Sequence, residues 1–194
     1  MRLATSPRLL PVGREEREAK LKDFVAANLT QRLAAAGEDT NCYTVLARGP
    51  DSPVAAALAA LAGDLRSGNI VIRAILLDLD GMSEDQVKSS LLDMNNVEIR
   101  LLQDPRFTSA HEQLVLSSSR VWIGDCMRRD PAKRDAFEMF HDQNPIAATH
   151  AAVSFSRMWA GAKPVRRVRP IAPELVLASQ IPTDGEQQQP APRR

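Results

Sequence analysis

Cysteines, long apolar runs and a strong net charge are all scarce in this sequence, and each scarcity excludes a class of protein. Only Cys42 and Cys126 occur, in unrelated contexts, so neither a disulfide framework nor a repeated metal-ligand spacing is predicted. The longest apolar run, PVAAALAALAG, is far shorter than a membrane span, and the apolar stretch near the N-terminus is too short for a secretory signal. We therefore expect a cytoplasmic protein with no membrane insertion.

The charge balance does not indicate which kind of partner the protein binds. Lys and Arg number 25 and Asp and Glu 24, which gives a formal net charge of +1. This value neither favours nor excludes a nucleic-acid partner, because local patches of charge decide such binding. A chain of 194 residues, 44% of them apolar, is long enough to bury the core of one domain with extensions, and it contains no internal repeat.

The two ends of the chain differ in character from its middle. Residues 1–40 are predicted to form an N-terminal extension with one helix at 15–36. Its apolar stripe predicts docking on the domain, whereas its charged outer face leaves a partner-binding helix as the alternative. The stripe consists of Leu21, Val25, Leu29 and Leu33.

Residues 163–194 hold six of the thirteen prolines and show no periodic pattern, which predicts a basic, largely disordered tail. The tail begins with KPVRRVRP, which is interpreted either as a solvated basic linker or as a segment that grips phosphates or an acidic partner.

Residues 41–162 alternate between strand-like and helix-like segments. Ser52 and Pro53 are typical of a helix start, as are Asn144 and Pro145, and Ser83 with Gln86 forms a capping box. The order βαβαββββα predicts an α/β fold, in which a mixed β-sheet is sandwiched between helices. We expect 69–78 to be central in the sheet and flanked by helices at 53–66 and 145–160. The predicted strands are 41–48, 69–80, 96–102, 111–116, 120–124 and 136–141, with 111–116 and 120–124 forming a hairpin.

The order and spacing of these segments resemble one half of a phospholipase D superfamily domain, over roughly two-thirds of the chain. The likeness rests on GPDSPVAAALAAL after the first strand, and on SGNIVIRAILLD and NNVEIRLLQD before a strand that begins with histidine. FHDQNPIAATHAAVSFSRMWAGAKP looks like the final strand and the Trp-containing helix that close such a half domain.

The resemblance implies a particular chemistry. The family motif reads HxKxxxxD, followed by Gly-Ser and then an asparagine, and its histidine attacks phosphorus to form a covalent intermediate. The lysine holds the non-bridging oxygens and stabilises the transition state. A second copy of the motif supplies the histidine that protonates the leaving group, so single-copy members act as homodimers. The resemblance implies neither a metal nor a cofactor.

Here the motif is degenerate. His111 matches the nucleophile, but Gln113 stands where the lysine belongs and Ser118 where the aspartate belongs. Gly124 matches the glycine one residue early, and Asp125 replaces the serine after it. An alternative interpretation of His111 is a structural histidine whose hydrogen bonds are satisfied at a strand start.

These replacements would make the phosphate cleft about two charge units more negative, where one pair of charges about 4 Å apart is worth roughly 4 kcal/mol. Arg128 and Arg129 are weak candidates for phosphate binding in compensation. We therefore predict a catalytically degenerate domain with a binding or structural role. The alternative is a dimeric, metal-independent phosphodiesterase or nuclease that uses His111 from each subunit.

A second motif competes with this one. Asp78 and Asp80 in AILLDLDGM resemble the first motif of haloacid-dehalogenase-type phosphatases, and Asp125 and Asp130 imitate their acidic Mg²⁺ motif. The context argues against this fold, because a strand and a helix precede the motif and about 45 residues separate its two parts. Asp-x-Asp-Gly is also ordinary turn chemistry. The phosphatase is kept as a remote alternative.

Overall fold

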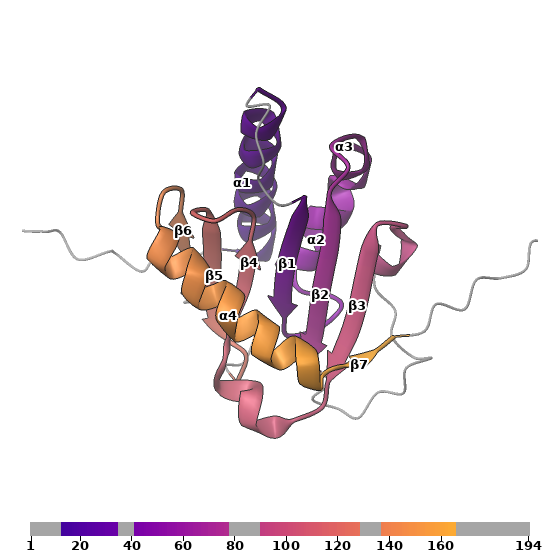
Figure 1. Cartoon of the computed structure of the whole chain (residues 1–194), viewed down its shortest axis with the longest axis vertical. Helices are drawn as coiled ribbons and strands as arrows, with labels where there is room; N and C mark the ends of the chain where they lie inside the picture. Colours follow the sequence, from indigo (N-terminus) through magenta and orange to yellow (C-terminus); the bar gives the residue numbers. More distant parts are fainter. Residues whose placement is uncertain (1–12, 35–40, 78–89, 129–136, 166–194) are drawn as a thin grey trace, which may run out of the picture.

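The structure, a computed structural model, describes residues 13–34, 41–77, 90–128 and 137–165. These residues form a seven-stranded sheet with helices on both faces (Figure 1). The predicted α/β class with a mixed, helix-covered sheet is confirmed. The strand order is β6-β5-β4-β1-β2-β3-β7.

The sheet divides at β1 into an antiparallel half and a half that is parallel except for its edge strand β7. β1 pairs in parallel with β2, and β2 with β3, whereas β4, β5 and β6 extend the other side of β1 in antiparallel pairs. The predicted hairpin is confirmed as β4–β5, while the short edge strand β7 was not predicted. The predicted central strand, β2, is interior, but β1 holds the middle position. The strands are β1 (Cys42–Ala47), β2 (Val71–Leu77), β3 (Val97–Leu102), β4 (His111–Val115), β5 (Val121–Cys126), β6 (Met139–His141) and β7 (Lys163–Pro164).

Two helices begin where their capping residues predicted. Ser52 accepts a hydrogen bond from the Ala55 N–H at the start of α2, and Asn144 does the same for Ala147 at the start of α4. The helix predicted at 53–66 is broken at Leu61 into two. The capping box at Ser83 lies outside the described residues. The helices are α1 (Arg14–Ala34), α2 (Pro53–Ala60), α3 (Ala62–Ser67) and α4 (Pro145–Gly161), with 3₁₀ turns η2 (Ser90–Asp93) and η3 (Pro105–Ser109).

On one face of the sheet, α1 and α2 cover the principal hydrophobic core. Leu21 and Val25 of the predicted stripe are fully buried, and Leu29 nearly so, against side chains that include Leu58 and Trp122. Each such side chain contributes roughly 1.5–3 kcal/mol by burial. The docking predicted for this helix is therefore confirmed, whereas the boundary proposed at residue 40 lies outside the described residues. None of the described helices is long and apolar enough to cross a membrane.

On the other face, α4 crosses the sheet obliquely and covers only part of it (Figure 1). Phe155 and Met158 pack against apolar side chains from the second halves of β1, β2 and β3, and Ala148 and Ala151 pack against β4 and β5. The first halves of β1–β3 remain partly open on this face, where Val71 is 46% exposed. The oblique course of α4 thus decides which strand residues meet solvent.

The close packing at Gly124 provides a test of the core. A Cβ at this position would lie 2.5 Å from the ring of Trp122, which is fully buried. We expect Gly124→Ala to lower the free energy of unfolding by about 1–3 kcal/mol, as overpacking generally does. Urea denaturation followed by circular dichroism measures this change.

Gly63→Ala is the matched control, because a Cβ at this position of α3 meets nothing within 4 Å. There we expect no loss, and a gain of up to about 1 kcal/mol from helix propensity. Equal effects of the two substitutions would contradict the packing described around Trp122.

Candidate functional site

The histidine singled out by the sequence lies where the sheet changes direction. Strands β2 and β3 run parallel to β1 on one side of it, and β4 adjoins its other side with reversed polarity. His111 begins β4 and so lies beside the carboxyl end of β1, because Leu46 pairs with Gln113. In open α/β sheets, ligands generally bind outside the carboxyl ends of strands at such a switch point.

The His111 ring is exposed and held in one orientation. Its Nδ1 lies 2.9 Å from the carbonyl oxygen of Gly124. A carbonyl only accepts hydrogen bonds, so Nδ1 carries the proton and donates, which leaves the lone pair on Nε2 of the neutral ring. The ring also packs edge-on against Phe137, with centroids 5.8 Å apart. This geometry suits a nucleophile or a general base.

Gln113, at the position of the motif lysine, is used for packing. It shares the sheet face of His111, but its side chain is buried beneath α4 and the residue is only 7% exposed. Its Nε2 donates a hydrogen bond of 2.9 Å to the carbonyl of Ala151 in α4. The amide therefore ties β4 to the helix, rather than facing a phosphate beside His111.

The other two motif positions also have local tasks. Ser118 is exposed in the β4–β5 turn, seven residues and on the order of 20 Å along the strand from His111. Asp125 accepts the N–H of Phe137 at 3.0 Å and so holds the segment whose ring packs on His111. The structure thus places Gln113 under α4 and Ser118 in the turn, while Asp125 bonds to the segment that packs on His111.

The remaining sequence candidates give little to the site as described. Arg128 has an exposed side chain that makes no hydrogen bond or ion pair with other described residues, while Arg129 lies outside them. Asp78, Asp80 and Asp130 of the phosphatase-like motifs lie outside the described residues too. Within the described ranges, no three or more His, Cys, Asp or Glu side chains lie close enough together to hold a metal ion.

A charged cluster that the sequence did not indicate lies on the opposite face of β4, toward α1. Glu112 is buried and accepts the N–H of Arg48 at 3.0 Å, which anchors the turn after β1. Glu138 pairs with Arg17 of α1, with 3.0 Å between Oε1 and Nε. Burial raises the pKa of both carboxyls, while nearby Arg17 lowers it and Asp125 adds repulsion.

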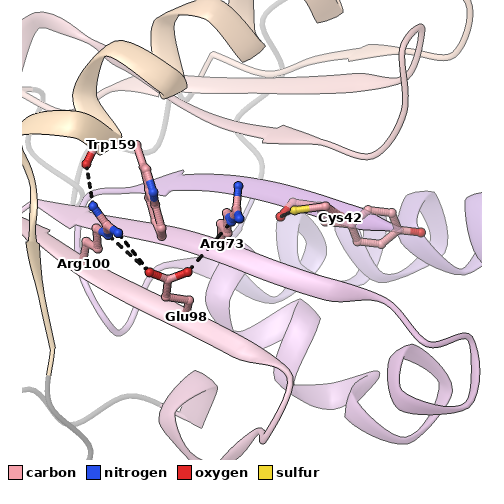
Figure 2. Close-up of polar contacts among 6 residues, drawn as sticks. Cys42, Arg73, Glu98, Arg100 and Trp159 are labelled. Carbon is pink, nitrogen blue, oxygen red and sulfur yellow. Dashed lines mark hydrogen bonds and ion pairs between the residues drawn. The ribbon is translucent and has the colours of Figure 1, made fainter. Parts of the chain in front are cut away.

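A second such cluster occupies the half of the sheet that α4 leaves open (Figure 2). Glu98 of β3 lies between Arg73 and Arg100, 3.9 and 3.1 Å from them, and Arg100 also donates to the Trp159 carbonyl. Burial raises the pKa of the neighbouring Cys42 thiol, although Arg73 opposes this, and the raised pKa favours the protonated thiol. Residues on four elements (β1, β2, β3 and α4) meet here, and no motif joins them.

Comparisons with solved structures identify the fold. No protein-family model matches the sequence, and neither does any curated protein. The chain is similar to NucT from Helicobacter pylori, with a TM-score of 0.51 and 10% identity over 78% of this chain and 92% of that one. It is also similar to Nuc from Salmonella typhimurium, a phospholipase D family member, with a TM-score of 0.48 and 11% identity over 71% and 90% of the chains.

The archaeal chromatin protein TrmBL2 aligns with a TM-score of 0.49 and 15% identity over 79% of this chain, which spans about half (52%) of TrmBL2. The similarity to NucT, whose TM-score exceeds 0.5, gives the chain the phospholipase D-like fold that the resemblance predicted. At identities this low, the similarity establishes the fold alone.

Glu112 provides a test of the buried cluster. Its raised pKa means that the folded protein binds this proton more tightly than the unfolded chain does. Its contribution to stability is therefore complete below the ordinary carboxyl pKa and is lost as the pH rises through the raised value. We expect Glu112→Gln, which keeps an acceptor for Arg48, to lose less stability than the wild type between about pH 4 and pH 7.

Urea denaturation at a series of pH values measures the effect, with the exposed Glu98→Gln as the control. A constant difference between Glu112→Gln and the wild type at every pH would show that burial does not penalise the ionised carboxylate.

Proposed function

We propose that this protein is a phospholipase D-like domain that has lost efficient phosphodiester chemistry and acts in binding or as a structural component. The observation that carries the proposal is the hydrogen bond from buried Gln113 to the Ala151 carbonyl. The position of the motif cation holds a neutral amide that points under α4. Among the described residues, no Lys or Arg side chain contacts His111 in its place.

The absence of the motif cation has a large energetic effect. A positive charge about 4 Å from a developing phosphorane oxygen contributes roughly 4 kcal/mol at an intermediate effective dielectric. Its loss lowers the rate by about three orders of magnitude. Asp125 adds a negative charge next to Phe137, in the immediate surroundings of His111. Both changes act against an anionic substrate.

A turnover assay tests the proposal. With bis(p-nitrophenyl) phosphate as substrate, we expect wild type and His111→Ala to release p-nitrophenol at the same low rate. His150→Ala removes a different exposed histidine, on α4, and serves as the matched control. Turnover that disappears in His111→Ala and persists in His150→Ala would overturn the proposal.

That outcome would favour the second candidate, a dimeric, metal-independent phosphodiesterase. The observation in its favour is that His111 is exposed with Nδ1–H bound to a carbonyl, which leaves Nε2 to attack phosphorus. This candidate requires His111 from two copies of the chain, a dimer by light scattering, and turnover that EDTA leaves unchanged. Turnover that requires Mg²⁺ and is lost in Asp78→Asn would instead support the haloacid-dehalogenase-type phosphatase.

The proposal also covers the location, the partner and the domain organisation of the protein. We propose that it acts in the cytoplasm with an acidic or phosphate-containing partner, that 41–162 forms the phospholipase D-like unit, and that 163–194, which begins with β7 beside β3, continues as a basic tail. The arginines that follow Val165 in the sequence support such a partner, because clustered cations favour association with anions.

A further inference from the structure

The half of the sheet that α4 leaves uncovered presents two arginines to solvent. Arg73 and Glu98 are about half exposed, with side-chain accessibilities of 51% and 47%, and Arg100 lies partly beneath them at 26%. They stand on neighbouring strands, because Arg73 pairs with Glu98 in the β2–β3 register. Figure 2 shows their side chains on the same side of the sheet as the Trp159 ring.

Aromatic stacking holds the Arg100 guanidinium in place. It lies 4.2 Å from the centroid of the Trp159 ring, whereas Arg73 lies 5.8 Å from it. Trp159 in turn stacks on Phe155, which is buried in the core under α4. The Arg100 fork is therefore oriented before any ligand arrives, which lowers the entropy lost when it binds one.

This side of the molecule is also more basic than the chain as a whole. Strands β1, β2, β3 and β7 together with α4 carry four cations, Arg73, Arg100, Arg157 and Lys163, and a single acid, Glu98. Their net charge of +3 (four minus one) compares with +1 for the whole sequence. Val165 donates to the Ile99 carbonyl beside β3, and Arg166, Arg167 and Arg169 follow it in the sequence.

We propose that this open half of the sheet, through Arg73 and Arg100, contacts the phosphates of a nucleic-acid backbone. Guanidinium groups in a fixed plane bind phosphate oxygens in a bidentate manner, and a polyanion matches cations spread over several strands. Glu98 competes with the phosphates for both arginines and limits the affinity. The inference rests on the binding role proposed above, and it gives that role a partner at β2 and β3, whereas His111 lies on β4.

Arg73 is the residue to substitute, because its described contacts are one ion pair of 3.9 Å and a distant ring. Fluorescence anisotropy of labelled single-stranded DNA, single-stranded RNA and duplex DNA, at about 50 to 200 mM salt, gives affinity and salt dependence. We expect Arg73→Gln to weaken binding about fivefold and to lower the salt slope by about one. The three probes separate the sources of the same phosphate chemistry.

Glu98→Gln is expected to change the nucleic-acid affinity in the opposite direction. Removing the competing carboxylate should tighten binding by about threefold or more, a gain that a purely structural role would not produce. Arg106→Gln is the matched control, because Arg106 is an exposed arginine paired with Asp104 beyond the far end of β3. We expect it to change the affinity by less than about twofold.

Several outcomes would overturn the inference: no nucleic-acid binding by the wild type at low salt, equal losses in Arg73→Gln and Arg106→Gln, or weaker binding in Glu98→Gln. Equal binding of poly-glutamate with the same dependence on Arg73 would assign the face to acidic polypeptides instead. None of these results bears on the turnover of His111→Ala, so failure here is distinguishable from failure of the proposed function.

Discussion

The central strands have apolar side chains on both faces, so helices must cover both. The positions of the polar groups at the candidate site and on β2 and β3 depend on where those helices lie. Leu46 and Ile75 lie under α4, while Val45 and Ile72 lie in the core that α1 and α2 cover. Because α4 crosses its face of the sheet only once and obliquely, part of that face stays open. On the α4 face, Gln113 lies under the helix and packs there, whereas Arg73 lies in the open part and keeps an exposed charge.

The same constraint accounts for the state of the candidate site. Strand alternation directs residue 113 toward α4, where an unpaired ammonium group would be costly and an amide can satisfy a helix carbonyl. His111 lies two residues before Gln113 in β4. It stays exposed, and a hydrogen bond to a backbone carbonyl of β5 orients its ring. An exposed and oriented histidine therefore stands two residues before a neutral amide that is bonded to α4.

Much of the fold could be predicted because its signals are local. Ser52 and Asn144 mark helix starts through bonds to residues three positions away, and the β4–β5 hairpin joins neighbouring segments. The break at Leu61 is a local turn that the apolar stripe of 53–66 did not indicate. The two-residue strand β7 and the middle place of β1 depend on strands that are distant in the sequence. Backbone hydrogen bonds to those strands decide such features, and periodicity does not report them.

For the candidate site, the sequence alone shows which residues occupy the motif positions, including the neutral Gln113 and the histidine at the start of its strand. Only the tertiary structure decided that Gln113 points under α4 and that Glu138 meets Arg17 of the N-terminal helix. It also decided that Arg73 and Arg100 converge on Trp159. These contacts join elements far apart in the chain, and their geometry follows from how the helices pack across the sheet, which residue spacing along the sequence does not encode.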